Sequence, residues 1–192
     1  GLSLGSEGLR LQDNNDLYLW CIDFDGFAEV DSKNVDSGSG EYFNKWPSYT
    51  EISPSGTGFK QFILSNKKPE SKSKIAFSPS DFAKDYPSIK KYQDRAVEIF
   101  SRGLFLAMTG NRYNDKMLEL AVLNESELDQ LLDYLNKWAI DGGGKGGFSK
   151  TNVSNVVTLT SNTSYSRLEK TSLIKVLSYI DNQEETTWCD VA

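Results

Sequence analysis

Hydrophobic and polar positions along the chain predict several short strands followed by one long helix. Residues 17–24 form a nearly continuous apolar run, which is typical of a buried strand. Further short strands, bounded by turn residues, are expected within 2–11 and at 49–52, 59–64, 96–100 and 105–109. The polar segments 31–41 and 65–80 are expected to be loops. This pattern predicts an α+β domain.

The helix is expected at 125–138, with Asn124 as its N-cap and Glu127 at the third position of a capping box. Its leucines and a tryptophan recur at helical spacing and predict one face that packs on a core. The glycine-rich segment 141–147 ends this helix, and a second helix is expected from residue 171. We therefore expect a domain at 1–140, a Gly/Ser/Thr/Asn-rich linker at 141–170 and the start of a helical domain at 171–192.

The end of the first long apolar run carries two acids at alternate positions. If this run is a strand, Cys21, Asp23 and Asp25 share one face and apolar side chains occupy the other. Two carboxylates this close can hold Mg²⁺ over a substrate phosphate. Alternatively, Asp25 and Gly26 only open a turn and Asp23 is a half-exposed strand residue. This segment by itself leaves both interpretations open.

The amino-acid composition excludes several classes of protein. The 192 residues include no histidine, which excludes Ser-His triads and metal sites built on histidine. No apolar run approaches the ~20 residues of a membrane span, and no secretory signal is visible, so neither a membrane partner nor export is expected. Two distant cysteines favour a reducing cytoplasm. Residues 60–95 hold nine positive and four acidic side chains, compatible with a phosphate-binding surface or with a solvated lysine-rich loop.

Two further segments carry candidate chemistry. Between two expected strands lies a turn rich in Ser and Gly, whose backbone N–H groups and hydroxyls can cradle phosphate oxygens, and Lys60 follows it as a point charge. Its candidate residues are Ser53, Ser55, Gly56 and Gly58. The third segment has Glu98 on one strand, then Arg102, then a return strand ending in Thr109 and Gly110. Three acids and a phosphate cradle are the parts needed for metal-assisted nucleotidyl transfer.

With these motifs, the chain resembles the archaeo-eukaryotic primase superfamily, specifically the primase-polymerase domains of phages, plasmids and other mobile elements. The family has a D-x-D strand, a YTEISPSGxG segment and an acid-strand segment ending in Thr-Gly, in this order, and residues 48–58 (SYTEISPSGTG) match almost letter for letter. The likeness covers roughly residues 1–113 and implies that an N-terminal portion of the family's domain lies upstream of Gly1. Residues 173–192 resemble the opening of the helical primase C-terminal domain.

The resemblance implies an RRM-like antiparallel catalytic core with flanking helices. It implies that Asp23, Asp25 and Glu98 bind Mg²⁺ or Mn²⁺ and that the Ser-Gly turn, Thr109 and Gly110 lie beside the nucleotide. The implied activity is template-directed DNA primase and polymerase synthesis from nucleoside triphosphates on a DNA template. The implied partner is a helicase in the same polypeptide, within a bacterial or virus-infected cell.

Two departures from the family motif affect nucleotide binding. Lys60 stands where the family has a histidine that contacts the triphosphate, and Leu104 stands where an arginine is expected, with Arg102 the nearest guanidinium. Lysine can neutralise phosphate but lacks the geometry of an imidazole. A weakened, primase-like module that binds nucleotide or single-stranded DNA for a helicase is therefore the alternative function.

Overall fold

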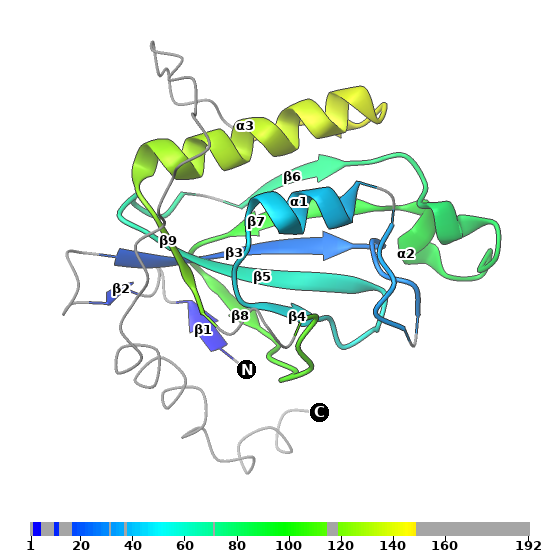
Figure 1. Ribbon diagram of the computed structural model, residues 1–192, viewed down its shortest axis with the longest axis horizontal. Helices are drawn as coiled ribbons and strands as arrows, with labels where there is room; N and C mark the ends of the chain where they lie inside the picture. Colours follow the sequence, from blue (N-terminus) through cyan, green and yellow to red (C-terminus); the bar gives the residue numbers. More distant parts are fainter. Residues whose placement is uncertain are drawn as a thin grey trace.

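Strand β3 (Leu17–Asp25) lies at the centre of the largest sheet and fixes the rest of the architecture (Figure 1). The computed structural model describes residues 2–4, 10–11, 17–30, 32–36, 38–70, 72–114 and 119–148. Within them β3 pairs antiparallel with β5 (Gly58–Ser65) on one side and β7 (Ala96–Phe100) on the other. The predicted strands at 17–24, 49–52, 59–64 and 96–100 are confirmed, with each boundary within one residue of the prediction.

The large sheet has eight strands, in the order β10-β6-β7-β3-β5-β4, with β2 also on β3 and β9 on β5. Among the strand pairs of the described residues, only β5–β9 is parallel, and a separate two-stranded sheet joins β1 and β8. The remaining strands are β1 (Leu2–Leu4), β2 (Arg10–Leu11), β4 (Thr50–Ile52), β6 (Ser73–Ala76), β8 (Leu104–Leu106), β9 (Ala121–Leu123) and β10 (Lys145–Gly146). The expected α+β class with an antiparallel sheet is confirmed.

Two helices, α1 (Ser39–Lys45) and α3 (Glu125–Asp141), cover one face of the sheet, while α2 (Lys90–Gln93) and a 3₁₀ turn, η1 (Asp81–Ala83), lie at one end (Figure 1). The predicted capping box of α3 is present. The Asn124 side chain accepts from the Glu127 backbone N–H, and the Glu127 carboxylate accepts from the Asn124 N–H. Among the described residues, no helix combines the length and apolar character needed to cross a membrane.

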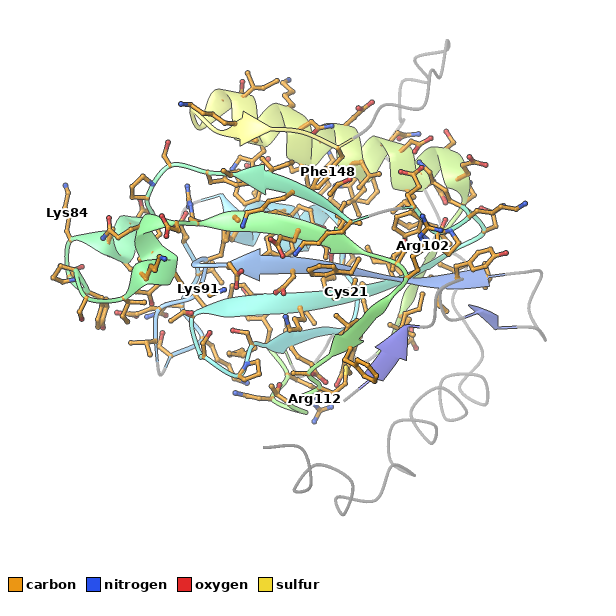
Figure 2. All side chains as sticks on the ribbon, turned by 180° about the vertical axis from the view of Figure 1, so that it is seen from behind. Cys21, Lys84, Lys91, Arg102, Arg112 and Phe148 are labelled. Atoms are coloured by element: carbon orange, nitrogen blue, oxygen red, sulfur yellow. The ribbon has the colours of Figure 1, made fainter. Side chains whose placement is uncertain are left out.

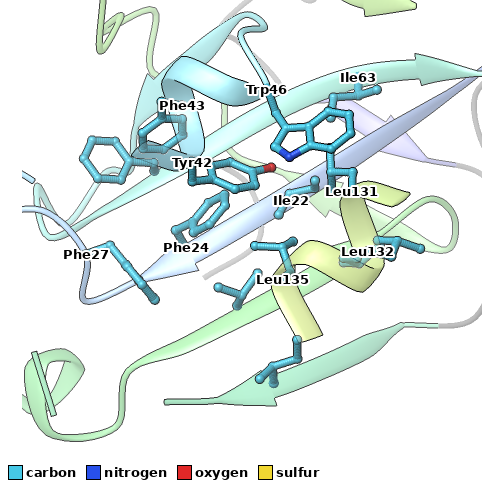
Figure 3. Packing of buried hydrophobic residues seen from close by; sticks show 14 of the residues in the cluster. Ile22, Phe24, Phe27, Tyr42, Phe43, Trp46, Ile63, Leu131, Leu132 and Leu135 are labelled. Atoms are coloured by element: carbon cyan, nitrogen blue, oxygen red, sulfur yellow. The ribbon is translucent and has the colours of Figure 1, made fainter. Parts of the chain in front are cut away.

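The main core lies between this sheet face and the two helices (Figure 3). Alternate residues of β3, beginning at Trp20, point into it, as the strand period requires. Phe24 contacts Tyr42 and Phe43 of α1 with ring centroids 5.0 and 5.5 Å apart. The leucines of the predicted α3 stripe are all buried there. Burial of these aromatic and leucine side chains fixes which face of β3 remains for polar residues.

The opposite face of the sheet carries no helix in the described part of the chain and is seen in Figure 2. A second, smaller cluster occupies one end of that face, where Cys21 packs with apolar residues of β5, β7 and β8. Its buried members are Leu17, Leu19, Cys21, Phe62, Leu64, Phe100, Leu106 and Leu120. Toward the C-terminal end of β3, the same face carries charged side chains instead.

Several local predictions are wrong. Helix α1 begins at Ser39, inside the expected loop, because Tyr42 and Phe43 are buried in the core. The expected loop at 65–80 contains β6, whose Ile75 is fully buried. Strand β8 ends at Leu106 and pairs with β1, so it does not return along β7.

Packing against the sheet continues past residue 140, where the sequence analysis places the end of the first domain. Strand β10 pairs with β6, and the Phe148 side chain is buried in the main core. The part of the chain packed on the sheet therefore extends through Phe148, and any linker begins after it. The remaining linker residues and the helices expected from residue 171 lie outside the described residues.

Candidate active site

Charged residues form a row across five neighbouring strands on the helix-free face of the sheet. Antiparallel register places Glu98 of β7 opposite Asp23, and Asp23 opposite Lys60 of β5. The row continues on one side to Lys74 of β6 and on the other to Glu51 of β4. Directly opposed residues have Cβ atoms about 4.5–5.5 Å apart, so each charge has an immediate neighbour. The structure thus brings two of the predicted acids, Asp23 and Glu98, side by side.

Asp25 lies on the same face, one strand step beyond Asp23. Its neighbours across the strands are Gly58 on β5 and Ala96 on β7, both small. The large side chain that reaches Asp25 is Lys91 of α2, with its ammonium 2.7 Å from Oδ2. The three predicted acids therefore share one area of the sheet.

Every predicted acid is paired with lysine. Lys60 donates to Oδ2 of Asp23, and Lys91 contacts Asp25. Lys72 and Lys74 contact the two oxygens of Glu98 at 2.9 and 3.1 Å. The lysines of the basic segment thus serve as counter-ions to the acids, which sequence reasoning did not foresee because the contacts join distant segments.

These lysines differ in exposure. The Lys60 side chain is only 12% exposed, whereas those of Lys72, Lys74 and Lys91 are 49–53% exposed. Exposed ion pairs are screened by water and contribute little to stability. Of the lysine pairs on the three predicted acids, Asp23–Lys60 is the most buried.

The electrostatics of the pair reflect this burial. Burial raises the pKa of the Asp23 carboxyl, and this effect outweighs the opposing attraction of Lys60. Burial by itself lowers the pKa of Lys60, but the charge and hydrogen bond of Asp23 more than compensate and raise it. Lys60 therefore carries its charge at neutral pH. Burial by itself raises the pKa of Glu98, but hydrogen bonds from Lys72 and Lys74 lower it, so that the pKa lies below its ordinary value.

The predicted phosphate-binding turn lies beside the end of β3. The Thr57 carbonyl accepts from the backbone N–H groups of Gly26 and Ala28, which directly follow Asp25. Three hydroxyls run along the turn, with Ser53 Oγ 3.0 Å from Ser55 Oγ, and Ser55 Oγ 2.8 Å from Thr57 Oγ1. The structure therefore brings a hydroxyl-rich turn next to the acids.

Two glycines of the turn have different roles. Gly56 adopts a positive φ of 71°, which favours glycine. Gly58 has no such requirement, but a Cβ there would overlap the Phe24 carbonyl oxygen on β3. Gly58 is thus explained by close packing of two strands, without reference to phosphate.

Glu51 is a buried carboxylate that sequence reasoning did not select as a site residue. It is 2% exposed and accepts from the Tyr49 hydroxyl at 2.6 Å and from the Thr109 backbone N–H at 2.7 Å. Thr109 Oγ1 also donates to the Ile52 carbonyl. Glu51 thereby anchors the Thr109–Gly110 segment beside β4, next to the turn. Its position within the YTEISPSG motif is the sequence feature that could have identified Glu51 as a site residue.

Arg102 lies apart from the other predicted residues. Glu98 is opposite Asp23 and Phe100 is opposite Cys21, so Arg102 follows toward the other end of β3. Figure 2 shows Arg102 and Lys91 near opposite ends of the sheet. The structure therefore does not group Arg102 with Asp25 and its neighbours. Leu104 begins β8, where it pairs with Leu4.

A divalent metal at this site would need several oxygen ligands from Asp23, Asp25 and Glu98. As the side chains stand, the described residues contain no group of three Asp, Glu, Cys or His that could hold a metal, and a lysine ammonium contacts each of the three predicted acids. The donors are nevertheless suitable oxygen ligands. Moreover, Oδ1 of Asp23 is buried and lacks a hydrogen-bond partner among the described residues. A divalent ion would satisfy that oxygen, so the residues fit such an ion provided that the lysines move.

Comparison with models of known protein families found no match for this chain. A search of curated proteins likewise found no match.

Proposed function

We propose that this chain is the catalytic domain of a metal-dependent DNA primase-polymerase, which adds nucleotides to a growing strand on a DNA template. The observation that carries the proposal is the register that sets Asp23 beside Glu98, with Asp25 one step away on the same open face. The hydroxyl-rich turn next to Asp25 supplies a place for phosphate oxygens.

Each residue has a distinct role in this proposal. Asp23, Asp25 and Glu98 hold Mg²⁺ or Mn²⁺, which lowers the energy of the charge that develops on the transferring phosphoryl group. The turn at Ser53, Ser55 and Gly56 orients phosphate oxygens through hydroxyl and N–H donors. Lys60 adds a positive charge beside them, and Glu51 fixes the Thr109 segment that borders the nucleotide.

The proposal extends to the fold family and the cellular setting. A central strand flanked by two antiparallel neighbours, with helices on one face, is compatible with the RRM-like core of primase-polymerases. On this basis the protein acts in replication of a phage, plasmid or other mobile element within the cytoplasm of its host. A helicase in the same polypeptide is the proposed partner.

Primer synthesis and extension on a single-stranded DNA template, with Mg²⁺ or Mn²⁺, test the proposal. Asp23→Asn and Glu98→Gln should each reduce extension by at least a hundredfold, because each removes a charged metal ligand while nearly preserving shape. The matched control is Asp133→Asn, an exposed carboxylate on α3 across the sheet, which should retain full activity. Equal activity of the wild type and both site variants would refute the proposal.

A weakened binding module is the second candidate, and a specific observation favours it. All three acids are paired with lysine, and Lys60 stands where the related motif has histidine. Such a module would bind nucleotide or single-stranded DNA and assist a helicase without synthesis. Clear nucleotide binding without any extension product, together with synthesis restored by Lys60→His, would support this candidate over the first.

A further inference from the structure

The two oxygens of the Asp23 carboxylate are in different situations. Asp23 is 8% exposed, and its Oδ2 accepts the hydrogen bond from Lys60. Its Oδ1 is buried without a hydrogen-bond partner among the described residues. Leaving a buried carboxylate oxygen unsatisfied is costly, so a cation that reached Oδ1 after a movement of the neighbouring side chains would bind it favourably. The Asp23 carboxylate therefore has one oxygen paired with Lys60 and one oxygen without a partner among the described residues.

The Lys60 ammonium is well placed to stay on Oδ2 of Asp23. It projects from β5, the central strand's direct neighbour, and its backbone is fixed opposite Asp23 by the sheet register. Its side chain is 12% exposed, unlike the half-exposed lysines on Asp25 and Glu98, which can swing into water. Removing water strengthens the attraction between Lys60 and Asp23 and also strengthens repulsion of any second cation.

We propose that Lys60 is a resident cation that competes with divalent metal at Asp23 and so weakens metal binding to this site. The inference builds on the proposed function, because it takes Asp23 as a metal ligand. An ammonium about 4–5 Å from a doubly charged ion lowers its affinity on the order of tenfold even with water-like screening. Metal binding at Oδ1 then displaces the Lys60 ammonium or is weakened by it.

Direct binding of Mn²⁺, followed through the electron paramagnetic resonance signal of the free ion, tests this competition without relying on activity. Lys60→Gln keeps a hydrogen-bond donor but removes the charge, and should bind Mn²⁺ about tenfold more tightly than the wild type. Lys60→Arg keeps the charge and should bind no more tightly than the wild type. The control Lys137→Gln removes an exposed lysine on α3, across the sheet, and should leave affinity unchanged.

A second measurement uses the unaltered protein, in case Lys60→Gln does not fold. With ¹³Cε-labelled lysine, addition of Mg²⁺ should shift the NMR signal of Lys60. The signal of Lys67, which is similarly buried but paired with Asp129 elsewhere, should stay in place. A Lys60 signal that does not respond to saturating Mg²⁺ would overturn the competition.

The outcomes separate this inference from the proposed function. Equal Mn²⁺ affinity in the wild type and Lys60→Gln, with the wild type active in primer extension, would overturn the competition and leave the function standing. Absence of Mn²⁺ binding in every variant would overturn both. Tighter binding by Lys60→Gln but not by Lys60→Arg would support the competition.

Discussion

Removing one partner of the Asp23–Lys60 pair should destabilise the protein strongly, whereas removing both partners should destabilise it little. Asp23→Asn and Lys60→Met each leave the remaining charge buried at the centre of the sheet. The double variant replaces the pair by neutral groups of similar size. We expect each single change to lower the free energy of unfolding strongly and the double change to recover most of that loss.

The magnitude follows from burial. Breaking a fully buried pair costs about 3–5 kcal/mol. The two side chains here are 12% and 11% exposed, so limited solvent access reduces the expected cost to about 2–4 kcal/mol for each single variant. The coupling energy of the double-mutant cycle should then be at least about 2 kcal/mol.

Urea unfolding of the four proteins at neutral pH, followed by tryptophan fluorescence and circular dichroism, measures this coupling. The exposed pair of Lys90, at the start of α2, and Asp94, its C-cap residue, provides a matched cycle, with side chains 88% and 65% exposed. Its coupling should stay below about 0.5 kcal/mol. A coupling for Asp23 and Lys60 no larger than that of the α2 pair would refute the reasoning.

Three further predictions concern the elements that support the site. Gly58→Ala should cost about 2–3 kcal/mol or more in urea unfolding, because its Cβ would overlap the Phe24 carbonyl oxygen. Gly40→Ala in α1 meets nothing closer than 3.8 Å and should be neutral or stabilising. Asn124→Ala should cost about 1 kcal/mol through loss of the α3 capping box, and an unchanged denaturation midpoint would contradict this. Although burial acts to raise it, hydrogen bonds from lysine lower the pKa of Glu98 in the folded state. Its stabilising contribution to the free energy of unfolding is therefore present above the unfolded-state pKa of about 4.3 and is lost as the pH falls through the lower folded-state pKa. Melting temperatures from about pH 6 to pH 3 should therefore fall more steeply for the wild type than for Glu98→Gln, and parallel curves would contradict the assignment.

The centre of the sheet was predictable from the sequence because its signals are local. Residues 17–24 form a long apolar run, and the capping residues of α3 are adjacent in the chain. Helix α1 was missed because polar residues surround Tyr42 and Phe43, and only the distant aromatic core makes a helix favourable there. Strand β6 has one buried apolar side chain, Ile75, which gives no periodic signal.

The placement of the two β3 acids on one face was predictable from the sequence, whereas their lysine partners were not. Alternation in β3 correctly placed Asp23 and Asp25 on one face. The lysine counter-ions depend on register between strands far apart in the sequence, as Lys60 and Glu98 illustrate. Spacing along the chain does not encode such register, so the same lysines looked like a general phosphate-binding surface or a solvated loop.

A crystal structure with Mn²⁺ and a nucleoside triphosphate tests the central proposal most directly. We predict anomalous density for Mn²⁺ between Asp23, Asp25 and Glu98, with the phosphates against the turn at Ser53 and Ser55. Nucleotide bound elsewhere, with the Lys60 ammonium still on Asp23 and no Mn²⁺ at the three acids, would contradict metal-dependent nucleotidyl transfer by this chain.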